Sequence, residues 1–197
     1  MKHDFSDVTS ENEAERLGRL YPIMLEEHNP NSKACCYEEE KTFLQKVFGD
    51  KILRISHIGS TAVTGLIAKP TVDILLEIKE NTDLTAITEV MLNDGYIVNT
   101  PEKDIIVYLK GYTPQGFVGQ AFHIHVRHSG DWDELYFRDY LIAHPEAARQ
   151  YEALKLGLKD EYEFDRDGYT AAKGEFIERI TTLARTEFTD KYKPVVE

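Results

Sequence analysis

The sequence predicts an α/β (α+β) fold in which a mixed sheet is flanked by helices and followed by a helical C-terminal part. Up to about residue 128, branched apolar runs typical of strands alternate with segments of helical spacing. From about residue 129 to 188, almost every segment has helical spacing. No internal repeat or low-complexity linker divides the 197 residues. We therefore expect a single domain over residues 1–197, with its core sheet at about 20–128.

The first elements are an amphipathic stretch at residues 13–25 and a helix over about 35–47. Three- and four-residue spacing in the second segment predicts the helix, with Tyr37, Lys41, Leu44 and Phe48 on one face. The Gly-Asp pair at residues 49–50 ends it.

Alternating branched and aromatic residues predict the strands. The first, at 51–58, ends at a Gly-Ser turn. The second, at 71–78, is apolar on both faces apart from two acids, as a central strand would be. A helix over 83–92 follows, and the remaining strand candidates are residues 96–99, 105–110 and 120–126.

Helices are predicted throughout the C-terminal part. The first covers residues 132–143, and Pro145 begins the second, with His144 near its cap. The second carries an apolar face of Ala148, Tyr151, Leu154 and Leu158. The last carries Tyr169, Ala172, Phe176, Ile180 and Leu183 on one face.

Composition excludes several classes of protein. A hydrophobic content of 42% excludes a disordered chain. The 35 acidic and 23 basic residues give a net charge of −12, which disfavours long nucleic acids and anionic membranes as partners. Cys35 and Cys36 are too few for a disulfide framework and lack the spaced partners of a zinc finger. Since the N-terminal residues are acidic and no apolar run reaches about 18–20 residues, we expect a cytoplasmic protein.

The segment from His57 to Glu77 carries the chemistry. Gly59 lets the backbone turn sharply and approach a ligand, while Ser60 and Thr61 offer hydroxyl groups and amides. If a helix starts there, its amides form a seat for phosphate. The alternative is a turn that only caps the strand.

Two acids share one face of the second strand. Asp73 is costly within an apolar strand unless it is paired or binds a cation, and Glu77 lies on the same face. Carboxylates of this kind bind Mg²⁺, which bridges the phosphate oxygens of a nucleotide. The alternative is that Asp73 pairs with a basic residue and that Glu77 is solvated.

His123 and His125 also share one face of a predicted strand. With Asp73 they would form a mixed site for Zn²⁺, Mn²⁺ or another first-row ion. One of them would otherwise serve as a general base, or both would simply form hydrogen bonds at a strand end.

The run HIGSTAV-x-GL-x-AKP-x-x-DI, with the later FHIHV, FRDYL and Tyr-x-x-x-Lys elements, resembles the GrpB family of the nucleotidyltransferase superfamily over about residues 20–185. The resemblance implies a nucleotidyltransferase-like fold that holds a divalent metal and a nucleotide. Gly59 and Ser60 match the superfamily's turn, and Asp73 matches its first acid. Leu75 stands where the second acid is expected, and FHIHV offers His123 and His125 in place of the third.

Further basic residues are candidates for ligand binding. His57 shares the strand with the turn, and Lys69 is held extended before Pro70. Arg138 in FRDYL offers a planar fork for an anion. Lys155 and Lys173 are similar to lysines that recur in the family. A structural pairing or a solvated helix face is the alternative for each of them.

Three functions remain open. The first is a metal-dependent nucleotidyltransferase-like protein that binds a nucleotide or small phosphorylated substrate, with Mg²⁺, Mn²⁺ or Zn²⁺ at Asp73, His123 and His125 and with Glu77 as a further catalytic residue. The second is a non-catalytic nucleotide or metabolite-binding module. Because some chains of the family join this domain to a dephospho-coenzyme A kinase, coenzyme A metabolism is its implied context. The third is hydrolysis at an Asp/His metal centre.

Overall fold

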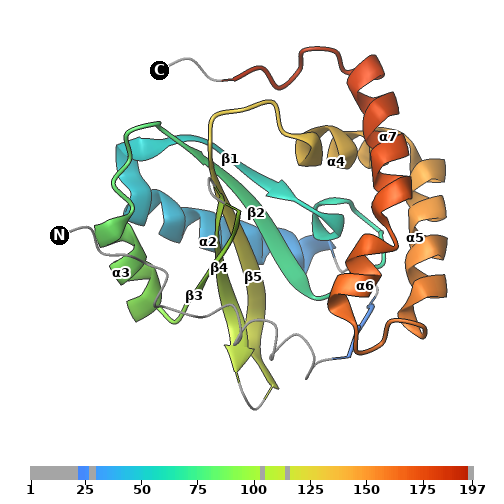
Figure 1. Ribbon diagram of the computed structural model, residues 1–197, viewed down its shortest axis with the longest axis horizontal. Helices are drawn as coiled ribbons and strands as arrows, with labels where there is room; N and C mark the ends of the chain where they lie inside the picture. Colours follow the sequence, from blue (N-terminus) through green and yellow to red (C-terminus); the bar gives the residue numbers. More distant parts are fainter. Residues whose placement is uncertain (1–21, 27–29, 103–104, 114–115, 195–197) are drawn as a thin grey trace.

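A mixed sheet forms the centre of the structure. The computed structural model describes residues 22–26, 30–102, 105–113 and 116–194. Within these ranges the sheet has five strands (Figure 1). They are β1 (Ile52–Ile58), β2 (Thr71–Ile78), β3 (Ile97–Glu102), β4 (Ile105–Thr113) and β5 (Gly116–His128). The predicted stretch at 13–25 falls mostly outside the described residues.

The strand order puts β2 inside the sheet. It is β1-β2-β5-β4-β3, with β2 and β5 parallel and the other neighbouring pairs antiparallel. Every residue of β2 except Asp73 is buried. The predicted central strand and the predicted mixed sheet are therefore confirmed.

Helices cover both faces of the sheet. They are α2 (Pro30–Phe48), α3 (Thr85–Asn93), α4 (Asp133–Ala143), α5 (Pro145–Lys159), α6 (Arg166–Ala171) and α7 (Gly174–Glu187). In Figure 1, α4 to α7 gather at the right, while α2 passes behind the sheet. The predicted helix boundaries agree with these to within a few residues, apart from that of the last helix.

The predicted last helix was wrong as a single element. It breaks into α6 and α7 at Ala172 and Lys173, immediately before Gly174, a residue that weakens helices. Leu183, placed on its apolar face, is 44% exposed. The break matters for the site because it sets Lys173 at the N-terminal end of α7.

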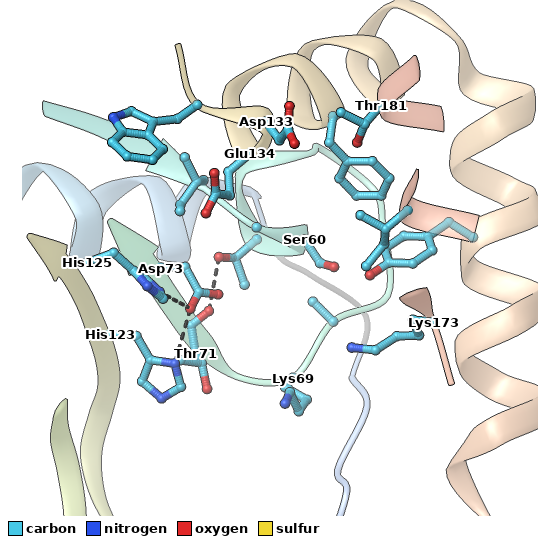
Figure 2. Close-up of a pocket in the computed structure, with 18 of the residues that line it drawn as sticks. Ser60, Lys69, Thr71, Asp73, His123, His125, Asp133, Glu134, Lys173 and Thr181 are labelled. Atoms are coloured by element: carbon cyan, nitrogen blue, oxygen red, sulfur yellow. Dashed lines mark hydrogen bonds and ion pairs between the residues drawn. The ribbon is translucent and has the colours of Figure 1, made fainter. Parts of the chain in front are cut away.

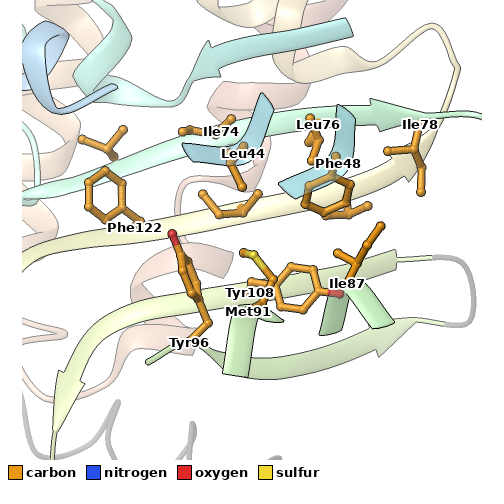
Figure 3. Packing of buried hydrophobic residues seen from close by; sticks show 13 residues of the cluster. Leu44, Phe48, Ile74, Leu76, Ile78, Ile87, Met91, Tyr96, Tyr108 and Phe122 are labelled. Atoms are coloured by element: carbon orange, nitrogen blue, oxygen red, sulfur yellow. The ribbon is translucent and has the colours of Figure 1, made fainter. Parts of the chain in front are cut away.

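The apolar core lies on one face of the sheet. Even-numbered residues of β2 pack there against α2 and α3 (Figure 3). Leu44, Phe48, Ile74, Leu76 and Met91 are fully buried. Each such side chain contributes about 1.5–3 kcal/mol through burial. This layer leaves the odd-numbered residues of β2, including Asp73, to face α4 to α7.

A buried ion pair ties β1, β2 and the loop before α4 together. Glu77 has no exposed surface, and its carboxylate is bound by the Arg54 guanidinium, whose Nη2 lies 2.8 Å from Oε1. The backbone N–H of Gly130 donates to the same carboxylate over 3.0 Å, and Arg54 Nη2 donates to the Gly130 carbonyl over 2.9 Å. The alternative of a solvated Glu77 at the strand end is therefore wrong, because Glu77 is fully buried in this ion pair.

None of the helices in the described ranges is both long and apolar enough to cross a lipid bilayer.

Removing Arg54 should destabilise the fold strongly. Arg54→Met leaves the Glu77 carboxylate buried without its cation, so we expect the free energy of unfolding in urea to fall by about 3–5 kcal/mol. The double variant Arg54→Met/Glu77→Leu removes both charges and should recover most of that loss. Equal losses in the single and double variants would contradict the ion pair's structural role.

Candidate functional site

A cavity of about 770 Å³ opens between the polar face of the sheet and helices α4 to α7. Figure 2 shows its labelled residues converging from both sides. The Gly59-Ser60 turn, Asp73, the two histidines of β5 and residues of α5 and α7 all line it. The cavity thus brings together most of the residues that the sequence singled out.

The Gly59-Ser60 turn packs directly against Asp73. Gly59 has a φ of +70°, and a Cβ added to it would lie 2.7 Å from Asp73 Oδ2, so a larger residue does not fit. The turn continues into a single 3₁₀ turn at Ser60–Ala62, not into an α-helix. This turn therefore does not provide the N-terminus of an α-helix as a seat for phosphate.

Asp73, His123 and His125 form a cluster of potential metal ligands. Parallel pairing puts Asp73 beside His123, and the two-residue period adds His125 on the same face. Their ligand atoms lie within 4.8 Å of one another. Asp73 Oδ1 is 3.2 Å from His123 Nδ1 and 3.6 Å from His125 Nε2 (Figure 2).

The cluster's electrostatics favour a carboxylate beside neutral imidazole. Burial alone would raise the pKa of Asp73, but hydrogen bonds with His123 and His125 outweigh it and hold that pKa far below its usual range. Burial lowers the pKa of His123, although Asp73 opposes the shift. An ionised carboxylate and a neutral imidazole are the forms in which these groups bind metals.

Tyr112 of β4 orients His123 from behind. Its hydroxyl lies 2.7 Å from His123 Nε2, and the two rings stack with centroids 5.7 Å apart. This contact occupies Nε2 and leaves Nδ1 toward Asp73, as second-layer partners of metal ligands do. Sequence reasoning missed Tyr112 because only strand pairing brings it to the histidine.

Lysines reach the cavity from elements far apart in the sequence. Lys69 precedes β2, Lys155 lies on α5, and Lys173 immediately precedes α7. Lys155 is 2% exposed and Lys173 is 9% exposed. Lys155 Nζ donates to the Ile67 carbonyl and, over 3.3 Å, to Ser60 Oγ. The alternative of solvated helix faces for Lys155 and Lys173 is therefore wrong.

The three lysine ammonium groups repel one another in a poorly solvated part of the cavity. Burial, with Lys173 and Lys69 adding to it and Glu152 opposing it, lowers the pKa of Lys155 to about 7. Burial and Lys69 lower the pKa of Lys173 to about 8, against the effect of Asp73. The pKa of Lys69 is also lowered, first by burial and then by Arg166. An anion bound among them would relieve this repulsion.

His57 does not line the cavity, contrary to expectation. It pairs across from Ile74 in the sheet, so its side chain points to the apolar face and stacks on Tyr37, with ring centroids 4.8 Å apart. Its Nε2 lies 3.0 Å from Thr61 Oγ1, and that hydroxyl donates to the Thr71 carbonyl. His57 thus supports the turn from behind.

Arg138 and Glu77 also stay outside the cavity lining. The Arg138 guanidinium donates to the His57 carbonyl, to Tyr192 Oη and to Asp139, each over 2.8 Å. It therefore joins α4 to β1 and to the C-terminal segment. The cavity-facing position of this part of α4 belongs to Phe137.

Sequence reasoning missed several polar groups of the cavity wall. Tyr169 Oη, Thr181 Oγ1 and Arg127 Nε are buried and have no hydrogen-bond partner among the described residues, and all three side chains line the cavity. Asp131, Asp133 and Glu134 line it as well. A helical tyrosine or threonine gives no sign in the sequence that its hydroxyl is buried unpaired.

Comparison with known proteins now adds to this geometry. Residues 22–183 match the family model described as GrpB protein. This chain belongs to the GrpB family. It is 30% identical over 163 residues to the glutamate-rich protein GrpB of Alkalihalophilus pseudofirmus, a match that covers 80% of this chain and 93% of that protein.

Other proteins similar to this chain differ from it in length. The UPF0157 protein YqkA of Bacillus subtilis is 34% identical over 153 residues, 76% of this chain but only 44% of that protein. A dephospho-CoA kinase of Mycolicibacterium paratuberculosis is 27% identical over 156 residues, 38% of its length. The crystal structure of conserved protein GrpB from Enterococcus faecalis superposes with a TM-score of 0.74 and 26% identity, over 84% of this chain and 99% of that one. This chain shares its fold.

Gly59→Ala should disturb the site more than an ordinary glycine substitution. The new methyl group would press on the Asp73 carboxylate, and the φ of +70° with a ψ of −173° adds backbone strain of about 1–3 kcal/mol. Gly65→Ala is the matched control, because its φ is +81° and its Cβ would meet nothing within 4 Å. In urea unfolding we expect Gly59→Ala to lose at least about 1 kcal/mol more than Gly65→Ala. Equal losses would contradict the close packing of the turn on Asp73.

Proposed function

We propose that this GrpB protein is a metal-dependent, nucleotidyltransferase-like protein that binds a nucleotide or another small phosphorylated substrate. One observation carries the proposal. A cluster of one carboxylate and two imidazoles shares a single cavity with buried lysines and the Gly59-Ser60 turn. Metal ligands beside cationic groups match the needs of phosphate chemistry, in which a cation and ammonium groups together neutralise phosphate oxygens.

The donor set fits a first-row metal better than it fits magnesium. Mg²⁺ takes oxygen ligands, whereas imidazole nitrogen suits Zn²⁺, Mn²⁺ and their neighbours. Asp73, His123 and His125 would hold the ion and leave positions open toward the cavity. A bound metal of this kind polarises a phosphoryl oxygen and orients the reacting groups.

The lysines would hold the phosphate groups. Lys155 already contacts Ser60, so the hydroxyl of the turn and the Lys155 ammonium offer a phosphate oxygen adjacent donors. Lys173 and Lys69 approach from the other walls (Figure 2). Together they bind and orient the phosphorylated substrate and bear its negative charge. Arg138 and Glu77 have no part in this arrangement, because their partners lie in the fold.

The alternative function is a non-catalytic nucleotide or metabolite-binding module linked to coenzyme A metabolism. One observation favours it. Leu75, at the position of the second acid, is fully buried with Ile58 and Leu135, so that position contributes no metal ligand. For either function we propose a cytoplasmic protein whose partners are small ligands rather than long nucleic acids or membranes, as its net charge of −12 favours.

The metal cluster decides between these functions. We expect calorimetry to show that the protein binds Mn²⁺ or Zn²⁺ and that Asp73→Asn weakens this at least about a hundredfold, since one charged ligand is lost. His144→Gln is the control, because His144 pairs with the exposed Glu187 outside the cavity.

ATP and GTP binding should then require the metal and fail in Asp73→Asn. Tight nucleotide binding that is unchanged by EDTA would instead support the binding module. Transfer activity that survives Asp73→Asn would exclude the metal role.

Anion binding should weaken as pH rises. Lys155 and Lys173 lose their charge as pH passes their pKa values of about 7 and about 8. Sulfate keeps its charge between pH 6 and 9, so its affinity at constant ionic strength should fall roughly tenfold for each lost ammonium contact. Lys155→Met should bind sulfate weakly throughout and lose the step near pH 7. The pH dependence of pyrophosphate and nucleotide affinity is then compared with that of sulfate.

The ligand-free protein should show the opposite trend in stability. Unfolded lysines keep their proton up to a pKa near 10.5, whereas the folded Lys155 loses it near 7, so the unfolded state binds more protons between these values. Stability should therefore rise with pH in this window, and Lys155→Met should flatten the rise. An unchanged slope in Lys155→Met would show that Lys155 keeps an ordinary pKa.

A further inference from the structure

One face of α7 lines the cavity over most of the helix. Lys173, Ile177, Thr181 and Arg185 all line it, and they follow one another at intervals of four residues. At about 1.5 Å per residue, the distance along the helix axis from Lys173 to Thr181 is roughly 12 Å. The cavity is therefore longer than a phosphate group and its metal require.

The charge of the cavity wall changes along this line. Beside Lys173 it is cationic, through Lys69 and Lys155. The cavity wall also carries three carboxylates, those of Asp131 and Asp133 beside Arg185 and that of Glu134 beside Arg127. Arg185 lies 2.6 Å from Asp131 and 2.5 Å from Asp133, and Arg127 lies 2.8 Å from Glu134. The carboxylates outnumber these two guanidinium groups, so this end disfavours a further phosphate.

Thr181 offers an unpaired hydroxyl group at this acidic end. The residue is 6% exposed, and its Oγ1 has no hydrogen-bond partner within the described part of the chain. Figure 2 shows it next to Asp133 on the cavity wall. A buried hydroxyl left unpaired is unfavourable, so retaining one is most simply explained by a ligand that pairs with it.

Apolar walls complete this end. Phe137 of α4, Trp132 just before it and Ile177 of α7 line the cavity as well. Aromatic and aliphatic side chains accommodate a carbon skeleton, while a few placed polar groups fix its orientation. The combination suits a compact molecule with a carbon ring or chain and several hydrogen-bond donors.

We propose that the end of the cavity around Thr181, Asp133 and Glu134 is a second-substrate subsite for a small uncharged or cationic compound rich in hydroxyl or amino groups. This inference rests on the proposed function. In a transfer, a hydroxyl or amino group bound there forms the new bond to the α-phosphorus of a nucleoside triphosphate. The bond to pyrophosphate breaks, pyrophosphate leaves on the lysine side, and the proton of the hydroxyl or amino group passes to the Glu134 carboxylate.

Saturation-transfer NMR on the full chain with Zn²⁺ tests the subsite. The probes are glucose, glucosamine, inositol and spermidine, with glucose 6-phosphate as the anionic comparison and pyrophosphate as the probe of the lysine end. We expect at least one uncharged or cationic probe to bind. Glucose 6-phosphate should bind at the Thr181 end no more tightly than glucose does. Thr181→Val should weaken the binding about five- to tenfold, the effect of one hydrogen bond. Thr181→Ser, which keeps the hydroxyl, should bind within about twofold of wild type.

Thr182→Val is the matched control, since Thr182 is exposed and its hydroxyl donates to the Glu178 carbonyl. Because Thr181→Val removes an unpaired hydroxyl, its melting temperature should equal or exceed that of wild type, so a loss of binding is not a loss of folding. The inference is overturned if none of the uncharged or cationic probes binds, or if Thr181→Val binds them as wild type does. Pyrophosphate binding in the same samples separates this failure from failure of the proposed function, which would abolish both.

Discussion

The Asp73 carboxylate is the constraint around which this site is built. An ionised acid inside a buried strand is tolerated only when charged or polar groups surround it. Parallel pairing of β2 with β5 supplies His123 and His125, and a glycine at 59 lets the preceding turn close over the second carboxylate oxygen. The turn, the strand pairing and the imidazoles therefore all serve to surround the ionised Asp73 carboxylate with polar groups.

The lysines oppose this carboxylate without neutralising it. No ion pair joins Asp73 to Lys69, Lys155 or Lys173 among the described residues. For Lys69 and Lys173 the pKa is lowered, because burial outweighs the attraction of the Asp73 carboxylate. A fold optimised for stability alone would not bury ammonium groups so close together. Under the proposed function, a bound anion would offset this cost, which is how sites commonly exchange stability for function.

The elements of the fold and the core of the site could be predicted from sequence because both depend on short-range patterns. A run that is apolar on both faces apart from two acids located β2, and the two-residue period of a strand placed His123 with His125. The burial of Lys155, the pairing of Glu77 with Arg54 and the unpaired hydroxyl of Thr181 could not be predicted. Each depends on which helix or loop covers the side chain, and that is decided by packing between segments some 20 to 95 residues apart. Position 77 shows this well. Asp73 and Glu77 lie on the same face of β2, but Asp73 lines the cavity, whereas Glu77 is buried in an ion pair with Arg54.

The net charge of the protein and the lysines of its cavity both favour a small phosphorylated ligand over a long polyanion. A surface with a net charge of −12 repels a long polyanion, whose many phosphates interact with the whole field of the molecule. A small phosphorylated ligand presents few charges, and these would enter a cavity where lysines act at short range in poorly solvated surroundings, where charge interactions are strongest. If it carries its own divalent cation, or meets one at Asp73, its net charge falls and the long-range repulsion falls with it. Under the proposed function, an acidic molecule whose cavity has a lysine-lined end would therefore favour small metal-bound phosphates over nucleic acids, without any steric gate.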